Sequence, residues 1–395
     1  NFNTKNDKNS HFQKVNNLTH LGYKIIESKL DFELPFESIN FESGLKFSKT
    51  ENNSNIKYFN LLPNPVLIDS KSNEFNYKEY NYAIYVGADK KLSEQWSVKA
   101  GLRYEYTQNE GFTPKNNVMN KNYYGKLFPT FYANYKLNAQ NNFSLSYSKR
   151  IDRPNFRALN PFKWYDNPYY YSEGNPALSP SFLENIEFKY SHKSYIFSAY
   201  YIHSENDYGQ YVLPYKNGTQ GSTYMNYFNT NKYGVQFSMA KQLTNWWYNS
   251  SNINGFYAKS NTFDGFTIGQ ESFGAYLNFN NTFNLNSDKT FNIIINYSQS
   301  LPHKTGNKEF YNQYSLDTGL KLNLLNDKLN LSLTLNDILK TSLVKGKVLM
   351  KDQTFEFDNY YDTRYLSFEI SYSFGNNKVK GSEKEINFEE KNRSN

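Results

Sequence analysis

The chain has 395 residues and a formal net charge of +7 at pH 7, and aromatic residues make up 18% of it, including 37 Tyr and 32 Phe. Only 38% of the residues are hydrophobic, which is little aliphatic material for the thick core of a soluble domain of this size. The chain contains no Cys, which excludes disulfides, thiol catalysis and Cys-based metal sites. Basic residues are scattered among acidic ones rather than gathered in a stripe, so the pattern does not indicate nucleic-acid binding.

Apolar and polar residues alternate along much of the chain, which is typical of strands with one apolar face. Between Trp96 and Tyr106, for example, every second residue is apolar or aromatic, and the residues between them are Ser, Lys, Gly, Arg and Glu. Helical spacing is not sustained anywhere, and no run of about 18 apolar residues predicts a spanning helix. The alternation predicts about fifteen strands, centred on residues 25–34, 39–48, 76–90, 95–107, 125–137, 142–151, 183–190, 195–208, 224–240, 246–258, 270–283, 289–299, 312–324, 329–340 and 362–374.

The connections between these strands alternate in length. The short ones are residues 35–38, 91–94, 138–141, 191–194, 243–245, 284–288 and 325–328. The long ones are residues 50–73, 108–122, 152–181, 209–222, 260–269, 301–310 and 341–361. This asymmetry is typical of outer-membrane barrels, which have short periplasmic turns and long external loops. We therefore predict an all-β antiparallel transmembrane barrel, with a soluble sandwich or propeller as the open alternative.

The direction of the first strand suggests that the barrel is incomplete. If residues 35–38 form a periplasmic turn, then residues 25–34 descend from outside, and residues 1–19 belong to an external loop. Single-chain bacterial barrels have an even number of strands, whereas the count here is odd. We therefore expect at least one strand before Asn1, together with a signal peptide, since residues 1–10 contain no apolar segment.

Several motifs, taken in order, resemble the barrel of TonB-dependent receptors of the Bacteroidetes-type outer-membrane β-barrel family. They span roughly residues 75–375 and are Gly101-Leu102-Arg103-x-Glu105, Phe128-Pro129-Thr130, Arg153-Pro154, Leu159-Asn160-Pro161-Phe162, Gly174-Asn175-Pro176-x-Leu178-x-Pro180, Asn336-Asp337-Ile338 and the terminal Ser371-Tyr372-Ser373-Phe374-Gly375. Ser181 stands where an acidic residue often follows the last Pro of the fifth motif. The motifs follow one another in the order that they have in this family.

The resemblance implies a barrel of about 22 strands, of which these would be the last fifteen. It also implies a plug domain inside the barrel and a segment that engages TonB, both before Asn1. On this basis we assign residues 1–375 to the barrel. Residues 376–395 are rich in Lys and Glu and are expected to form a disordered periplasmic tail or to contact a periplasmic partner.

The loop at residues 152–181 contains the candidate site. Its Pro residues cannot donate ladder hydrogen bonds, and Asn-Pro pairs form turns, so we expect a structured loop. It could pack at the rim of the barrel, or it could contact ligand or plug from the lumen side. The candidate contact residues are Arg150, Arg153, Asn160, Trp164, Tyr165, Tyr169, Tyr170 and Asn175.

The sequence indicates no catalytic centre. The five His residues show no metal-ligand spacing, and no Ser lies in a G-x-S-x-G context. His203 with Asp207 is the nearest approach to an acid–base pair, and chance explains it. We therefore expect no enzyme activity and no cofactor.

The function predicted from these observations is that of an outer-membrane receptor or transporter. It would take up an unidentified substrate, and by resemblance its partners would be membrane lipid, its own plug and TonB. The alternative is a surface binding, adhesion or assembly barrel without active import, with surface or periplasmic proteins as its partners. Its loops would face outside and its tail the periplasm.

Overall fold

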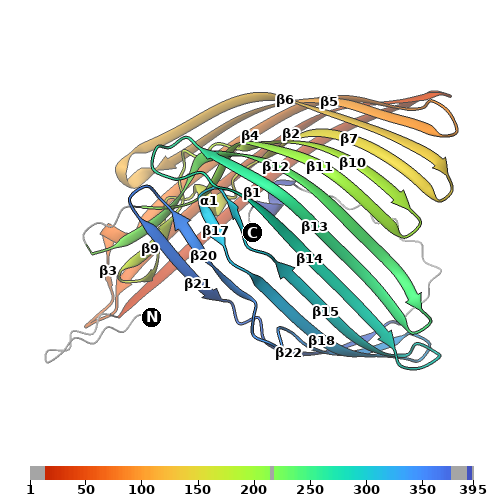
Figure 1. Cartoon of the computed structure of the whole chain (residues 1–395). Coiled ribbons are helices and arrows are strands. Elements are labelled where there is room, and N and C mark those ends of the chain that lie inside the picture. The colour runs from red at the N-terminus through yellow and green to blue at the C-terminus, as the bar shows by residue number, and fades with distance from the viewer. Residues whose placement is uncertain (1–13, 214–217, 375–388, 394–395) are drawn as a thin grey trace.

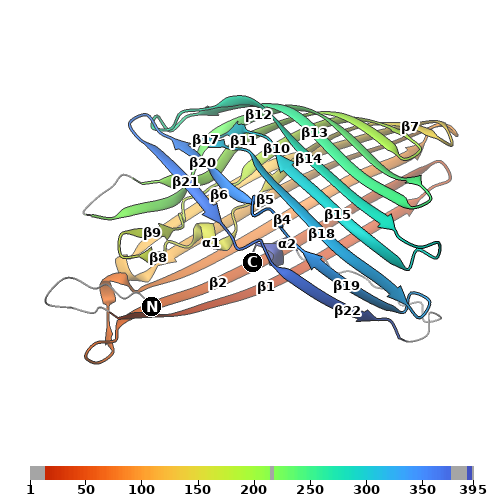
Figure 2. The ribbon, with the colours of Figure 1, turned by 60° about the horizontal axis from the view of Figure 1, so that its bottom comes forward.

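The computed structural model describes residues 14–213, 218–374 and 389–393. In these residues almost every element is a strand, and the strands run next to one another in a strongly curved sheet (Figures 1 and 2). No helix in the described part of the chain has both the length and the apolar character needed to cross a bilayer.

Fifteen strands form the wall of the barrel, each antiparallel to the next, and this confirms the count predicted from alternation. They are β1 (Val15–Pro35), β2 (Ile39–Asn60), β4 (Asn73–Lys91), β5 (Trp96–Thr113), β6 (Val118–Asn138), β7 (Asn141–Asp152), β10 (Ser181–His192), β11 (Tyr195–Val212), β12 (Gln220–Thr244), β13 (Trp247–Thr262), β14 (Glu271–Asn284), β15 (Phe291–Ser300), β18 (Gln313–Leu324), β19 (Leu329–Leu335) and β22 (Leu366–Tyr372). Among the described residues, β1 pairs only with β2 and β22 only with β19, so the wall has two free edges.

The long connections lie at one end of the wall and the tight turns at the other (Figures 1 and 2). The long connections contain the short elements β3 (Val66–Leu67), η1 (Asp69–Lys71), α1 (Phe156–Leu159), β8 (Lys163–Asn167) and β9 (Tyr170–Glu173). The connection between β5 and β6 is short instead, since η2 (Pro114–Asn116) joins strands that run through most of the loop expected at residues 108–122. A second sheet, called sheet D here, is formed by β16 (His303–Thr305), β17 (Lys308–Phe310), β20 (Leu343–Leu349) and β21 (Thr354–Tyr360). The sequence predicts plain loops where sheet D lies. Its central pair joins β17 to β20 across more than 30 residues, and local alternation does not reveal such a pairing.

The burial of the wall is inverted relative to a soluble protein. On β2 the polar residues Ser48, Thr50, Asn52 and Ser54 are buried on the inner face, whereas Phe41 and Leu45 are exposed on the outer face. On β4, Glu79 and Asn81 are buried while Ile84 and Val86 are more than half exposed. An apolar outer face and a polar interior are what a barrel surrounded by lipid requires.

An aromatic row marks the lower border of this apolar face, near the tight turns. It consists of direct register partners on six neighbouring strands: Trp96, Tyr135, Phe143, Tyr190, Phe197 and Phe237. Their ring centroids lie 4.7–6.4 Å apart from one strand to the next. Such belts of aromatic residues lie at the interface between lipid and water.

The upper border of the apolar face crosses β2, β4 and β5. Phe47, Tyr82 and Tyr106 are register partners there. The next outward-facing residues on β2 are Lys49 and Glu51, which form an ion pair at 2.8 Å. On β5, the interval from Trp96 to Tyr106 is about ten residues, which matches the length of a spanning strand. The strands continue beyond this border, and for this reason β2 runs to Asn60 although the sequence predicts a loop from residue 50.

Two glycines of the inner face lie directly beneath aromatic rings. Gly234 on β12 is paired with Tyr200 on β11, and a Cβ atom at Gly234 would collide with the Tyr200 ring. Gly274 on β14 is paired with Phe256 in the same way, and a Cβ atom added there would lie 2.6 Å from the ring. The missing side chains let both rings lie flat against the wall.

Only residues 389–393 of the predicted C-terminal tail belong to the described part of the chain. Glu389–Asn392 form the short helix α2, which lies against the inner wall with Arg393 (Figure 2). The disordered periplasmic tail expected for residues 376–395 therefore stays a prediction. Residues 376–388 and 394–395 lie outside the described residues.

Candidate functional site in the barrel lumen

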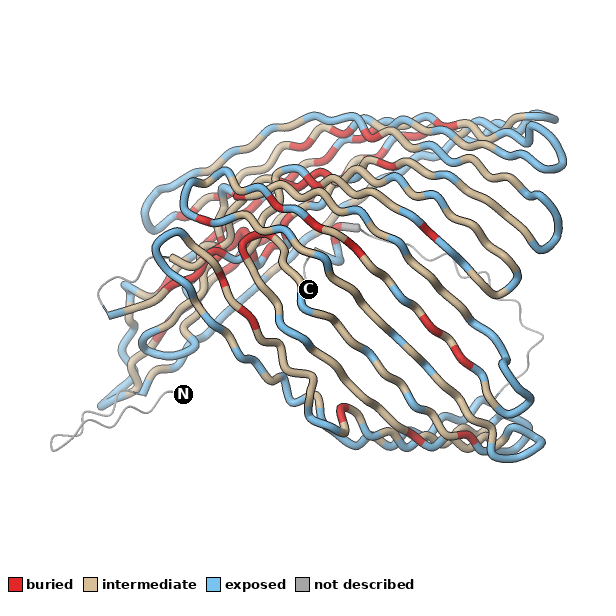
Figure 3. Tube along the Cα trace, in the orientation of Figure 1, coloured by how far each residue is buried: buried red, intermediate tan, exposed pale blue. Residues whose placement is uncertain are grey.

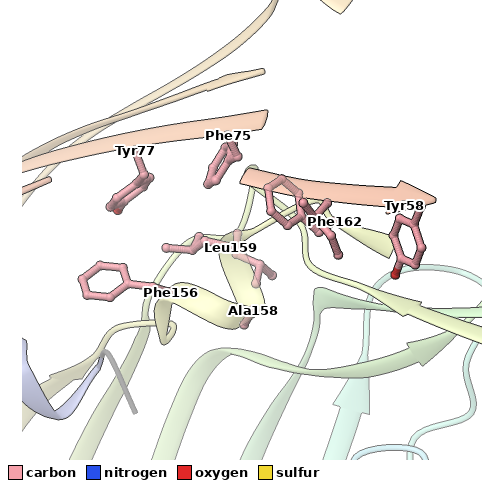
Figure 4. Close-up of a cluster of buried hydrophobic side chains, with 9 residues drawn as sticks. Tyr58, Phe75, Tyr77, Phe156, Ala158, Leu159 and Phe162 are labelled. Atoms are coloured by element: carbon pink, nitrogen blue, oxygen red, sulfur yellow. The ribbon is translucent and has the colours of Figure 1, made fainter. Parts of the chain in front are cut away.

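The loop between β7 and β10 folds inward, and buried residues gather where it meets the strands (Figure 3). Asn155 caps α1, because its Oδ1 accepts from the backbone N–H of Ala158 at 2.8 Å. Phe156, Leu159 and Phe162 of the loop then pack against the inner face of β2 and β4, where they contact an apolar patch that includes Tyr58 and Phe75 (Figure 4). The structured loop predicted from the Pro and Asn-Pro pattern is thus present and covers part of the wall.

An ionic network joins two of the sequence motifs that mark the family resemblance. Arg153 donates through Nη2 to Glu105 at 2.6 Å and to the Thr107 hydroxyl at 3.1 Å. Arg103 lies 2.7 Å from the other oxygen of Glu105. The side chains of Arg153 and Glu105 are 9% and 6% exposed. The motif at residues 101–105 therefore fixes the loop motif Arg153-Pro154 to the wall.

A cavity of about 780 Å³ lies beside this network on the inner wall. Charged side chains from β1, β2, β5 and β7 line it together with Glu390 and Arg393 of the tail. Arg150, one of the residues predicted from the sequence, also lines this cavity and is exposed to it. Arg150 and Arg153 thus lie at the same site, but Arg153 is fully engaged by the wall while Arg150 is open to solvent.

The two predicted Asn residues serve the loop itself. Asn160 is 2% exposed, and its Oδ1 accepts from the Phe162 N–H at 3.1 Å. Asn175 donates through Nδ2 to the Tyr224 carbonyl at 3.0 Å and accepts from the Ala177 N–H at 2.9 Å. Gly174 has to be glycine, since a Cβ there would lie 2.6 Å from the Ala158 carbonyl oxygen. These motif residues hold the loop's shape.

The predicted aromatic residues form a group at the mouth of the barrel. Trp164 packs on the buried cluster, with Arg157 over its ring at 5.7 Å. Tyr165 lies 4.4 Å beneath Lys71, and partial burial raises the pKa of its hydroxyl. Tyr170 donates to the Ser222 hydroxyl at 3.0 Å, whereas Tyr169 is 68% exposed. The structure therefore brings three of the four rings into contact with the barrel and leaves Tyr169 facing solvent.

Glu173 lies opposite Lys163 in the β8–β9 hairpin of the same loop. Burial raises the pKa of its carboxyl group, and Lys163 at 3.9 Å only partly offsets this effect. A cationic ligand bound at the mouth of the barrel would stabilise the charged form of this carboxyl group.

Three lumen residues were missed as site residues in the sequence: Glu79, Glu105 and Arg393. Glu79 and Glu105 occupy inward-facing positions in strands that alternate well, so an acidic residue on the predicted lumen face was an available signal. For Arg393 no such signal exists, because its position depends on a contact with Glu79 across 314 residues.

Asp337, in the Asn336-Asp337-Ile338 motif, binds the chain segments next to sheet D. It is 1% exposed at the end of β19, and its carboxylate accepts from the Thr341 N–H and the Thr363 hydroxyl, both at 2.8 Å. These bonds join the two strands that lead into and out of sheet D. No three metal-ligating side chains converge within the described ranges.

Comparison with known proteins places the chain in a family. Residues 1–372 match the model of the outer membrane protein beta-barrel family, and the chain belongs to that family. The resemblance drawn from the ordered motifs is thereby confirmed. No curated protein matches the chain.

Solved structures with a similar fold are receptors and transporters. The ferric yersiniabactin uptake receptor FyuA from Yersinia pestis aligns with a TM-score of 0.58 and 14% identity, over 91% of this chain and 55% of its own length. The ferric-catecholate import receptor Fiu from K12 E. coli aligns with a TM-score of 0.60 and 14% identity, over 90% and 55%. The copper transporter OprC gives 0.61 and 9%, over 90% and 57%. At these identities the likeness shows the fold alone, and the chain spans little more than half of each structure.

Proposed function

We propose that this chain forms the wall and outer loops of a receptor that imports a scarce solute across the outer membrane. The observation that supports this function best is the folded loop of residues 152–181, which ties aromatic side chains at the mouth to a charged cavity on the lumen wall. A barrel that only anchors a surface structure has no need for a charged recess behind its entrance.

The residues proposed to meet the solute follow from their places in this arrangement. Tyr169 is exposed at the mouth and Arg150 is exposed in the cavity, so these two are available to a ligand. Trp164, Tyr165 and Tyr170 would add aromatic ring faces, and the two Tyr residues would also add hydroxyl groups. Arg153, Asn160 and Asn175 support the loop rather than touch the solute.

Energy for import would come from the inner membrane through TonB, acting on a plug domain inside the barrel. This part of the proposal is carried by the family resemblance and by the uptake and import receptors of similar fold. The long connections would then face outside. Residues 1–375 would form the barrel domain, further strands would pair with the free edges of β1 and β22, and the tail of residues 376–395 would begin at the periplasmic end of β22.

Uptake by whole cells tests the proposal. Cells with and without the gene are given labelled ferric siderophores, oligosaccharides and peptides, each with and without a protonophore that collapses the proton gradient. We expect one class to accumulate only in cells with the gene, and only when the gradient is intact. Surface binding that is unaffected by the protonophore, with no accumulation, would instead support the alternative of a binding or adhesion barrel.

A simpler measurement tests the barrel itself. The purified protein is run on a denaturing gel with and without boiling. A folded barrel migrates differently from the heated chain, and equal mobility of the two samples would contradict a barrel fold.

A further inference from the structure

Glu79 is an acidic side chain placed deep on the inner wall. It is 3% exposed on β4 and accepts a hydrogen bond from the Tyr77 hydroxyl at 2.6 Å. A carboxylate at such a depth is costly unless a cation and further donors satisfy it. The residue that supplies the cation comes from the other end of the chain.

Arg393 meets Glu79 with both terminal nitrogens. Nη1 lies 2.5 Å from Oε1 and Nη2 lies 3.1 Å from Oε2, which is the paired geometry that a planar guanidinium forms with a carboxylate. Its Nε donates to the Pro154 carbonyl at 3.1 Å, and the Phe156 ring lies 4.6 Å from its central carbon. The three nitrogens of the guanidinium group and one of its faces are therefore matched by the wall and by the β7–β10 loop.

The backbone and a neighbouring residue add to this binding. The Phe156 N–H donates to the Arg393 carbonyl at 3.1 Å. Glu390, one turn earlier, is 1% exposed, lies 2.8 Å from Nη1 of Arg393, and accepts from the Ser48 hydroxyl at 3.5 Å. Two side chains and one backbone group thus fix this segment to β2, to β4 and to the β7–β10 loop.

We propose that Glu79, Tyr77, Phe156 and the Pro154 carbonyl form a binding site for an arginine side chain in the lumen, and that the chain's own Arg393 occupies it. The site is specific for guanidinium, because a Lys ammonium cannot pair with both carboxylate oxygens, reach the Pro154 carbonyl and lie flat on Phe156 at once. Since Glu390 and Arg393 also line the 780 Å³ cavity, the bound segment narrows the space in front of Arg150. Any other arginine-bearing segment or ligand that enters the lumen competes with it. The Glu79 site belongs to the wall, so arginine binding there is independent of solute uptake.

Cross-linking of two introduced thiols tests whether the segment docks. The chain has no Cys, so S48C/E390C introduces the only pair of thiols. The Ser48 hydroxyl meets the far end of the long Glu390 side chain at 3.5 Å, so the two thiols are joined by a short bismaleimide rather than by a direct disulfide. A protease site inserted beside Lys115, in the connection between β5 and β6, separates the two thiols along the chain. After cross-linking and cleavage we expect the two fragments to remain joined on a denaturing gel.

S315C/E390C is the matched control, because Ser315 lies on β18, far along the wall from β2, and its fragments should separate. Separation of the S48C/E390C fragments would overturn the docking.

A ligand titration tests the specificity of the site. Argininamide and lysinamide are added to the wild-type protein, to R393A and to R393A/E79Q, and the unfolding temperature of each is measured. In R393A we expect argininamide to raise that temperature at concentrations at least ten-fold lower than lysinamide. In the wild-type protein and in R393A/E79Q the response should be weak. Equal responses to both amides in R393A would overturn a guanidinium site, even if the thiols of S48C/E390C are cross-linked.

Discussion

Arg153 and Glu105 form an ion pair of 2.6 Å between residues that lie 48 positions apart. One belongs to the loop at the barrel mouth and the other to the middle of a wall strand. The pair is almost completely buried and shares Glu105 with Arg103. It is therefore the point at which the shape of the entrance is coupled to the interior of the wall.

Removal of Arg153 should release the loop while leaving the wall intact. We expect R153A to destabilise the docked loop by about 2 kcal/mol, less than the 3–5 kcal/mol typical of a broken buried pair, because Arg103 still neutralises Glu105. Proteolysis of the loop at residues 152–181 measures the change, and R150A serves as the control because Arg150 faces the open cavity. If R153A and R150A are cleaved at the same rate, the pair does not hold the loop.

Positions on the outer face should differ in how strongly an introduced charged residue destabilises the barrel. Leu102 and Gln108 both lie on the outer face of β5, but Leu102 lies within the apolar band and Gln108 beyond its aromatic border. We expect L102R to reduce stability in lipid vesicles by about 2–4 kcal/mol and Q108R by less than about 1 kcal/mol. Urea titration of the folded protein in vesicles measures both. Similar losses for the two variants would mean that the border is misplaced.

Gly234 on the inner face of β12 can be compared with Gly255 on the outer face of β13, which pairs with the exposed Val235. A methyl group at Gly234 meets the Tyr200 ring, whose hydroxyl donates to Asn254 at 2.9 Å, whereas a methyl group at Gly255 meets nothing within 4 Å. We expect G234A to cost about 1–3 kcal/mol through displacement of the ring. G255A should be neutral or slightly stabilising, because Ala restricts the unfolded chain. Urea midpoints of the two variants provide the measurement, and a G255A loss as large as that of G234A would contradict this explanation.

The loop should open more easily as the pH rises from acid toward neutral. Burial raises the pKa of Glu173 above its ordinary value of 4.5. Between that value and the raised value the docked loop binds more protons than the released loop, so the stability of the docked state falls as the pH increases. Fluorescence of Trp164 in a protein with its other three Trp residues replaced by Phe reports the docking. In E173Q the pH dependence should disappear, and its persistence would assign it to another group.

The wall was predictable from the sequence because lipid on one side and water on the other impose alternation on every spanning strand. All fifteen wall strands were located in this way, from β1 to β22. The same reasoning underestimated their length on β2, because beyond the bilayer both faces meet water and the apolar half of the alternation is lost. Lys49, Glu51 and Asn53 on the outer face show this change directly.

The candidate site was predictable only in part. The loop was identified through its Pro and Asn residues, and Arg153 was named as a candidate for a polar lumen contact; in the structure its side chain is buried against Glu105. Glu105, which pairs with Arg153, was recognised only as a motif residue, because no local pattern indicates which basic group an inward-facing acidic residue will contact. Sheet D and the Arg393 contact depend on pairings between distant segments, and these are fixed by tertiary packing rather than by periodicity.

The unequal lengths of the wall strands give the molecule a direction within the plane of the membrane. β2 and β6 have 22 and 21 residues, whereas β19 and β22 have 7 each. At about 3.3 Å per residue the long strands measure roughly 70 Å and the short ones roughly 23 Å. One flank of the barrel therefore stands far above the lipid and presents ion pairs such as Lys121 with Glu110, while the opposite flank ends near the lipid and carries sheet D. A membrane protein that approaches within the plane of the bilayer therefore meets long strands with charged side chains on one side of the barrel and short strands on the other. The two sides of the barrel are thus not equivalent as contact surfaces.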